Sequence, residues 1–236
     1  MPFTNKQKYT LFCGFLTEIT NSLIILLMTK VHLSRILSFC GILAPPIMIF
    51  FILLAGHFTP GYNHITDTVS KLSDQASQNP RLMTVGFISY GVLIIAFSYA
   101  LYLRLRHGIK AHLAWFTLTL YGISMILAGI YQDSPGGKDA PLNPEGIMHN
   151  VAIITSCISI MIGMWMFAGS VYKKPSWFGF TWFTFGASFL GLVLSIIFAV
   201  QSQVPAAGLL QRLFYLVLLI WIETVSIWLF KLSFKH

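Results

Sequence analysis

The chain has 236 residues, of which 56% are hydrophobic and only 9% are charged. A soluble domain carries about 25% charged residues, so this chain cannot form a water-facing surface, and its 15% aromatic content excludes a disordered chain. Its three cysteines lie singly in apolar stretches, which excludes a disulfide framework, and its net charge of +8 is spread over segment ends. We therefore predict an integral membrane protein with no nucleic-acid partner.

The segment Tyr9–Thr29, within residues 1–34, is the first predicted element. It is long enough to cross a bilayer, but Glu18 near its middle would cost a few kcal/mol on insertion. On a helical wheel its large apolar residues share one face, and Thr10, Thr17 and Asn21 lie opposite. This pattern favours a helix that lies in the membrane interface, and a seventh span is the alternative.

Six later stretches are apolar and long enough to cross a hydrocarbon core about 30 Å thick, which takes about 20 helical residues. They are Ile36–Ala55, Leu82–Leu103, Leu113–Tyr131, Ile147–Val171, Trp177–Val200 and Leu209–Phe230. Arg212 is the basic residue inside them, close enough to one end to snorkel. We predict an all-α bundle of six transmembrane helices over residues 35–236, with one long loop at residues 56–81.

The distribution of Lys and Arg predicts the orientation. If both termini are cytoplasmic, four of the 15 basic residues lie outside, namely Lys71, Arg81, Lys138 and Arg212, and the other eleven lie inside. Cytoplasmic loops carry an excess of Lys and Arg. We therefore predict a multi-pass cell-membrane protein with both termini in the cytoplasm and loop 56–81 outside.

Histidine and aspartate residues gather at the predicted outer face. His57, His64 and Asp67 come from the first span and its loop, Asp133 follows the third span, and His149 opens the fourth. The ends of the third and fourth spans are neighbours in sequence, and the long loop can reach them. Titratable groups at one face of a membrane protein indicate a candidate site.

The long loop contains a helical pattern after the turn at Pro60-Gly61. Thr66 or Asp67 is placed to cap a short helix. Its apolar stripe would be Ile65, Val69 and Leu72, with Asp67, Ser70 and Asp74 opposite. The polar face either meets water, which we favour, or folds over the helix ends and brings Asp67 and Ser70 towards Asp133 and His149.

Several of these residues resemble the signature of the domain-of-unknown-function family 998, which comprises prokaryotic six-span membrane proteins. The matching stretches are Pro60-Gly61-Tyr62, Ile65–Leu72, Asn79-Pro80, Leu82–Leu103 with Gly86 and Tyr90-Gly91, Ala128–Pro135 and Gly146–His149. The resemblance covers about Arg35 to Phe230. A weaker similarity extends to eukaryotic autophagy-modulator and GPI-anchor-remodelling membrane proteins. The resemblance implies six spans and supplies no established reaction.

Two function classes fit these residues. The first, which we favour because polar clusters without a motif are more often structural, is a non-catalytic protein that binds membrane lipid at the outer cluster. The alternative is a lipid hydrolase or acyl transferase with Ser70 as nucleophile, His149 as general base and Asp67 or Asp133 as orienting carboxylate.

A zinc site formed by His57, His64 and His149 is a weaker alternative, because no H-x₃-H or H-E-x-x-H spacing exists on the outer side. We expect no metal and no other cofactor. The sequence identifies no protein partner.

Overall fold

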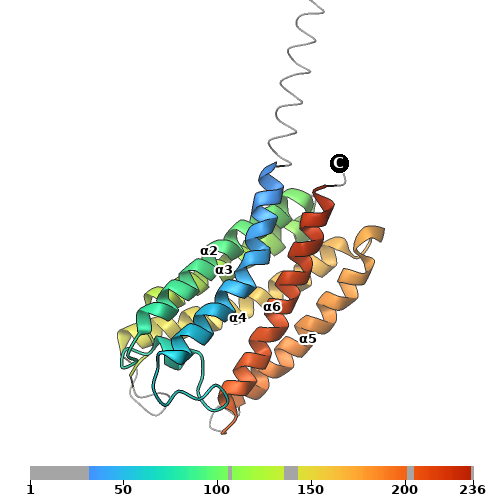
Figure 1. Ribbon diagram of the computed structural model, residues 1–236. Coiled ribbons are helices and arrows are strands. Elements are labelled where there is room, and N and C mark those ends of the chain that lie inside the picture. The colour runs from blue at the N-terminus through green and yellow to red at the C-terminus, as the bar shows by residue number, and fades with distance from the viewer. Residues whose placement is uncertain (1–31, 106–107, 136–142, 201–204, 235–236) are drawn as a thin grey trace, which may run out of the picture.

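The fold is a bundle of long helices, seen in a computed structural model that describes residues 32–105, 108–135, 143–200 and 205–234 (Figure 1). The long helices are the first helix (His32–His57), α2 (Pro80–Leu105), α3 (Ile109–Ile130), α4 (Pro144–Val171), α5 (Phe178–Val200) and α6 (Ala207–Leu232). Two short 3₁₀ helices, η1 (Ser70–Ser73) and η3 (Pro175–Trp177), lie in connections. All six long helices are apolar enough to cross a membrane, which confirms the predicted all-α bundle of six spans.

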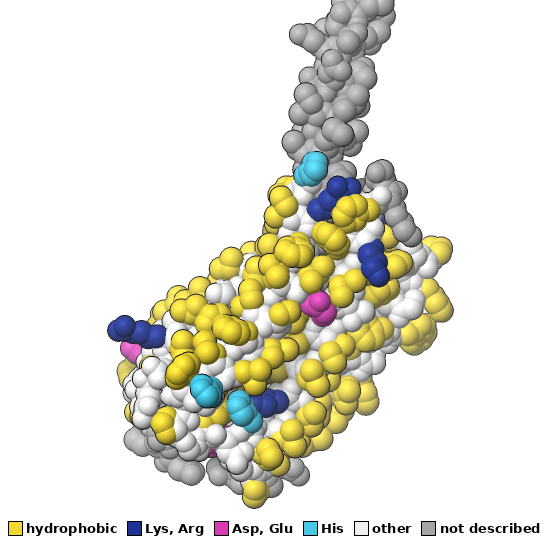
Figure 2. Space-filling model, viewed as in Figure 1, with side chains coloured by type: hydrophobic (Ala, Val, Ile, Leu, Met, Phe, Trp, Pro, Cys, Tyr) yellow, Lys and Arg dark blue, Asp and Glu magenta, His cyan; other side chains and the backbone are white. Residues whose placement is uncertain are grey.

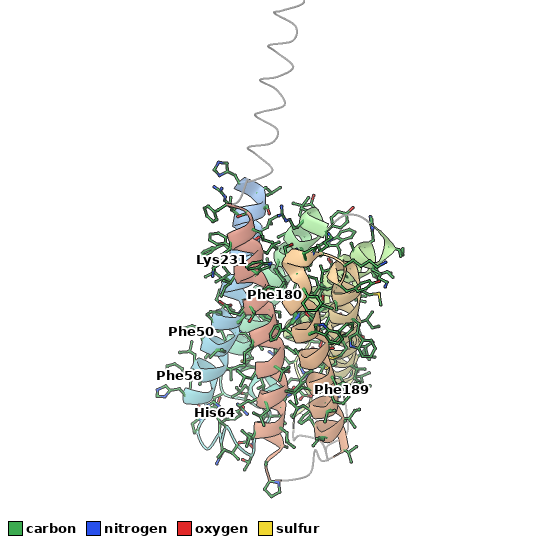
Figure 3. The ribbon with its side chains drawn as sticks, turned by 90° about the vertical axis from the view of Figure 1, so that its right-hand side faces the viewer. Phe50, Phe58, His64, Phe180, Phe189 and Lys231 are labelled. Carbon is green, nitrogen blue, oxygen red and sulfur yellow. The ribbon has the colours of Figure 1, made fainter. Side chains whose placement is uncertain are left out.

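Successive helices run up and down, so their connections lie at two opposite ends of the bundle (Figure 1). We call one the termini end, because the first helix begins there and α6 finishes there, and the Arg35 guanidinium donates to the Ser233 carbonyl at 3.2 Å. The other is the loop end, which carries the long loop and the α3–α4 and α5–α6 connections. In Figure 3, Lys231 lies towards the termini end and His64 lies at the loop end.

Close helix packing depends on small residues, as is usual in membranes. A Cβ on Gly91 of α2 would lie 2.5 Å from the Gly122 carbonyl oxygen of α3, so these backbones are in direct contact. A Cβ on Gly41 of the first helix would meet Ser226 of α6 and Phe97 of α2. The first helix therefore lies against both α2 and α6, while α3 packs between α2 and α4.

The surface between the two ends is largely apolar. Figure 2 shows hydrophobic side chains over most of one face, with Lys and Arg near its ends. Large side chains such as Phe50, Phe116 and Phe189 are more than half exposed, which suits contact with lipid tails rather than water. The chain is a multi-pass membrane protein by these criteria, and its orientation in the membrane stays a prediction.

The long loop is less helical than predicted, and the first predicted element lies outside the described residues. The loop helix expected from Thr66 or Asp67 is wrong in extent, because only Ser70–Ser73 is helical, and Val69 precedes it as N-cap. Of the predicted apolar stripe, Val69 and Leu72 are fully buried and Ile65 is 55% exposed. The segment Tyr9–Thr29 lies outside the described residues, so both the interfacial helix and the seventh span stay predictions.

Candidate functional site

The long loop is tied on one side to the first turns of α6. The Val69 N–H donates to the Gln211 side-chain oxygen at 2.6 Å, and the Leu209 N–H donates to the Ile65 carbonyl at 2.9 Å. A Cβ on Gly208 would lie only 2.2 Å from a loop carbonyl, so glycine allows the loop to approach the helix backbone directly. These bonds satisfy loop groups that face the bundle rather than water.

Arg212 is the main anchor of the loop. One guanidinium nitrogen donates to the carbonyls of His64 at 2.6 Å and Asp67 at 2.9 Å, and to that of Gly208 within α6 at 3.0 Å. The other donates to the Tyr62 hydroxyl and to His64 Nδ1, the latter at 3.0 Å. We expected Arg212 to snorkel to the interface, but its side chain holds the loop. A basic residue inside an apolar stretch usually has polar partners within the protein, so the sequence position of Arg212 was a signal that it binds other groups of the chain.

Arg212 also affects the titration of the loop. Burial and the Arg212 charge lower the pKa of His64 below its ordinary 6.5. Burial raises the pKa of Tyr62, against the opposing Arg212 charge and hydrogen bond. Burial acts to raise the pKa of Asp67, but hydrogen bonds from Lys71 at 2.7 Å and from a backbone N–H hold it below its ordinary 3.8. The attached loop therefore favours neutral His64, neutral Tyr62 and ionised Asp67.

On its other side the loop pairs with the segment after α3. The Gln75 N–H donates to the Asp133 carbonyl at 3.2 Å, and the Asp133 N–H donates to the Ser73 carbonyl at 3.3 Å. These two bonds make an isolated β-bridge between Asp74 and Asp133. The Asp133 carboxylate turns back and accepts from the Ser134 N–H at 2.9 Å. Asp133 thus contributes mainly its backbone to the attachment of the loop.

Asn143 connects the loop to α4. Its side-chain oxygen caps the helix by accepting from the Gly146 N–H at 2.8 Å, and its amide nitrogen donates to Gln75 Oε1 at 2.8 Å. Gln75 also donates to the Glu145 carboxylate at 3.1 Å. Asn143 and Gln75 were not among the predicted site residues. The Asn-Pro-Glu sequence at residues 143–145 is a recognisable helix start, but nothing in the sequence indicated its partner in the loop.

The loop brings Ser70 to His149, which is fully buried. His149 Nδ1 lies 2.9 Å from the carbonyl oxygens of both Ala128 and Tyr131. His149 Nε2 lies 3.5 Å from Ser70 Oγ. Ser70 itself is only partly buried, whereas His149 has no exposed surface.

These contacts determine which nitrogen of His149 carries a proton. Carbonyl oxygens only accept, so Nδ1 must be the N–H donor. In the neutral ring Nε2 then has the lone pair, and it faces the Ser70 hydroxyl. The carbonyls of Ala128 and Tyr131 occupy the position in which we predicted the carboxylate of Asp67 or Asp133. They belong to the C-terminal end of α3, where the helix dipole is negative.

The remaining predicted site residues lie apart from this pair. Asp67 forms an ion pair with Lys71 at 2.7 Å. His57 is exposed and packs on Phe58, while His64 contacts Arg212. Within the part of the chain that the structure describes, no three His, Cys, Asp or Glu residues gather closely enough to hold a metal ion. Of the four catalytic candidates, the structure therefore brings together the side chains of Ser70 and His149.

A small cavity lies deeper in the bundle, between the first helix, α2, α3 and α6. Its volume is about 10 Å³, room for about one water molecule, and Tyr90, Tyr121 and Tyr215 contribute to its wall. The Tyr90 and Tyr121 hydroxyls are 2.9 Å apart. Tyr90 lies about one helical turn from Phe87, whose ring contacts that of His149. This cavity is too small to hold an acyl chain.

Comparison with known proteins places the chain in a family without a known activity. A family model described as "Protein of unknown function (DUF998)" matches residues 42–228. Neither a curated protein nor a solved structure matches the chain. The matched region contains α2 to α5 completely and most of the first helix and α6, and it includes Ser70 and His149. This agrees with the resemblance based on the loop and helix motifs. The chain belongs to the DUF998 family.

Proposed function

We propose that this protein is a membrane-embedded acyl hydrolase or acyl transferase that acts on lipid esters, with Ser70 as nucleophile and His149 as general base. The observation that carries the proposal is the orientation of His149. Two carbonyls hold Nδ1 as the N–H donor, which leaves Nε2 directed at Ser70 Oγ. A nucleophile, a base within reach and a group that orients the base are the parts of a serine acyl-transfer site.

The reaction begins when Ser70 Oγ attacks the ester carbonyl carbon and its proton passes to His149 Nε2. The ester C–O bond then breaks, and Nε2–H returns the proton to the departing alcohol. Water or a second alcohol next attacks the acyl-serine, with His149 again as base, and releases acid or new ester. The 3.5 Å separation is longer than a strong hydrogen bond, as is common before substrate binds.

The end of α3 takes the place of the usual carboxylate. During proton transfer His149 becomes an imidazolium, and the carbonyls of Ala128 and Tyr131 accept its Nδ1–H. Those carbonyls lie at the negative end of the α3 dipole, which stabilises a positive charge by about 0.3–2 kcal/mol. The His149 imidazolium would therefore be stabilised without a carboxylate, because Asp67 pairs with Lys71 and Asp133 holds the loop through its backbone.

The depth of the pair suggests a lipid substrate. α4 has 28 residues, about 42 Å of helix, and His149 lies about 7 Å from its start at the loop end. A hydrocarbon core about 30 Å thick would leave about 6 Å of α4 on each side within the headgroup layer. His149 therefore lies near the level at which ester carbonyls of glycerolipids meet the hydrocarbon.

A fluorophosphonate probe tests this function, because it phosphonylates an activated serine. The purified protein should be labelled at Ser70, as located by peptide mass spectrometry, and Ser70→Ala should abolish labelling. His149→Gln should slow it about 100-fold or more. Ser77→Ala is the matched control, because the Ser77 hydroxyl is buried without a hydrogen-bond partner among the described residues. Labelling that persists in Ser70→Ala, or its absence from the folded native protein, would refute the proposal.

Lipid binding without turnover is the second candidate, and the complete burial of His149 favours it. Val69, which precedes Ser70, and Leu72, two residues after it, are also fully buried, so the Ser70–His149 contact would then serve to close the loop over the bundle. In this case Ser70→Ala should lower the unfolding temperature, the probe should not react, and membrane lipid should copurify with the protein. The proposed enzyme instead predicts little change in unfolding temperature for Ser70→Ala.

A further inference from the structure

Two lysines flank one tyrosine at the termini end of the bundle, opposite the candidate site. Lys110, in the first turn of α3, places its ammonium 6.0 Å from the centre of the Tyr172 ring. Lys173, just after α4, places its ammonium 5.4 Å from the same ring. All three side chains are exposed. The Lys110 side chain crosses α4 at Gly169, where a Cβ would lie 3.0 Å from its Cδ.

The positive charge at this end has no acidic side chain near it in sequence. Residues 99–115 and 166–180 contain five Lys or Arg and no Asp or Glu. The seven acids of the chain are Glu18, Asp67, Asp74, Asp133, Asp139, Glu145 and Glu223. Among the described residues, Asp67, Asp74 and Asp133 lie in connections at the loop end, Glu145 lies in the first turn of α4 at that end, and Glu223 lies within α6. An anion that neutralises Lys110 and Lys173 would have to come from outside these two segments.

The position of Lys110 is not explained by helix stability. The start of α3 carries the positive end of the helix dipole, where a cation is unfavourable and an anion is favourable. Gly108 precedes the helix, and no side chain caps it. The excess of basic residues at one end accounts for the number of cations, but it does not account for a lysine at this helix start that shares the Tyr172 ring with Lys173. An anion bound between them would be stabilised by both ammonium groups and by the helix start.

Aromatic side chains near this group are of the kind that concentrates at headgroup level. Tyr102 packs against Trp115 with ring centres 4.9 Å apart and against His112 at 5.3 Å, close to the ends of α2 and α3. Tyr and Trp concentrate where spans meet the headgroup layer. Below them, Phe116 of α3 is 59% exposed and Trp165 of α4 is 43% exposed, which offers apolar contact to acyl chains. A phosphate attached to acyl chains can therefore use both surfaces together.

We infer that Lys110, Tyr172 and Lys173 bind the phosphate of an anionic phospholipid in the leaflet at the termini end. The two ammonium groups donate to phosphate oxygens as point charges, and the Tyr172 hydroxyl supplies a further donor. The acyl chains lie along α3 and α4. This site is separate from Ser70 and His149 and does not depend on the proposed reaction.

Lipid retention measured by native mass spectrometry tests the inference on the full-length protein in detergent. Phosphatidylglycerol should bind more tightly than phosphatidylcholine. A juxtamembrane lysine contributes about 1 kcal/mol to the binding of anionic lipid, so Lys110→Gln and Lys173→Gln should each weaken phosphatidylglycerol binding about 5-fold. The double variant should weaken it about 25-fold. Lys231→Gln is the matched control, because Lys231 is exposed at the same end on α6 and should change little.

Competition with inorganic phosphate tests whether the site binds a lipid phosphate or a free anion. Inorganic phosphate should fail to displace phosphatidylglycerol, because it lacks the acyl chains. Displacement at concentrations similar to those of the lipid would assign the site to a free anion and overturn the inference. Equal phosphatidylglycerol binding by the double variant and the native protein would overturn it as well. Unfolding temperatures are compared in parallel, and we expect no change because the substituted side chains are exposed.

Discussion

Gly208 provides a direct test of the contact between the loop and α6. In Gly208→Ala the new Cβ would lie 2.2 Å from the Asp67 carbonyl oxygen, whereas ordinary contacts begin near 3.4 Å. The loop backbone would have to move by more than 1 Å, away from the N–H of Leu209 and the guanidinium of Arg212. Such overpacking costs about 1–3 kcal/mol. Alanine regains up to about 1 kcal/mol of helix propensity, so we expect a net loss of about 1–2 kcal/mol.

Gly186→Ala is the control for this experiment. Gly186 lies in α5, and a Cβ there would have no atom within 4 Å, so only the propensity gain applies. We expect Gly186→Ala to raise the free energy of unfolding by up to about 1 kcal/mol. Both variants are compared by tryptophan fluorescence during unfolding in one detergent. If Gly208→Ala stabilises the protein as much as Gly186→Ala, the loop does not pack on α6 as described, and the placement of Ser70 would lose its support.

Three further predictions concern pH, topology and the N-terminal segment. The His64 pKa is lowered when the loop is attached, so attachment is strongest above pH 6.5 and weakens as the pH falls from 6.5 to the lowered pKa. Hydrogen exchange of the loop amides should therefore be faster at pH 5.5 in the native protein. The increase should be much smaller in His64→Gln. The lowered Asp67 pKa also weakens loop attachment as the pH falls, but only below about pH 3.8. If the loop stays attached at pH 5.5 and opens only below pH 3.8, His64 does not have this role. Gln78 and Ser176 are both exposed. On intact cells, a cysteine at position 78 should react with an impermeant thiol reagent and a cysteine at position 176 should not. Reaction at position 176 and not at position 78 would mean that the orientation is inverted. A chain that begins at Met28 should still insert and fold, and failure to insert would favour a seventh span over an interfacial segment.

The loop motif shows how far sequence patterns reach. Its helical spacing placed Ile65, Val69 and Leu72 on one apolar stripe, and of these Val69 and Leu72 are fully buried. Ile65 does not share their burial, because the chain turns before η1 and only Ser70–Ser73 is helical. Local periodicity specifies a face only while the backbone stays regular. Here hydrogen bonds from Arg212 hold the preceding residues in an irregular path.

The sequence by itself determined the class of the protein and its six spans. Both follow from the length and apolar content of single segments, because each membrane helix satisfies its own backbone hydrogen bonds and needs no partner to be recognised. The tertiary structure alone decided the partners of the polar residues. Asp67 forms an ion pair with Lys71, Asp133 joins the loop through its backbone, and His149 donates from Nδ1 to carbonyls at the end of α3. Backbone carbonyls have no sequence signature, so their role beside His149 depends entirely on how α3, α4 and the loop pack together.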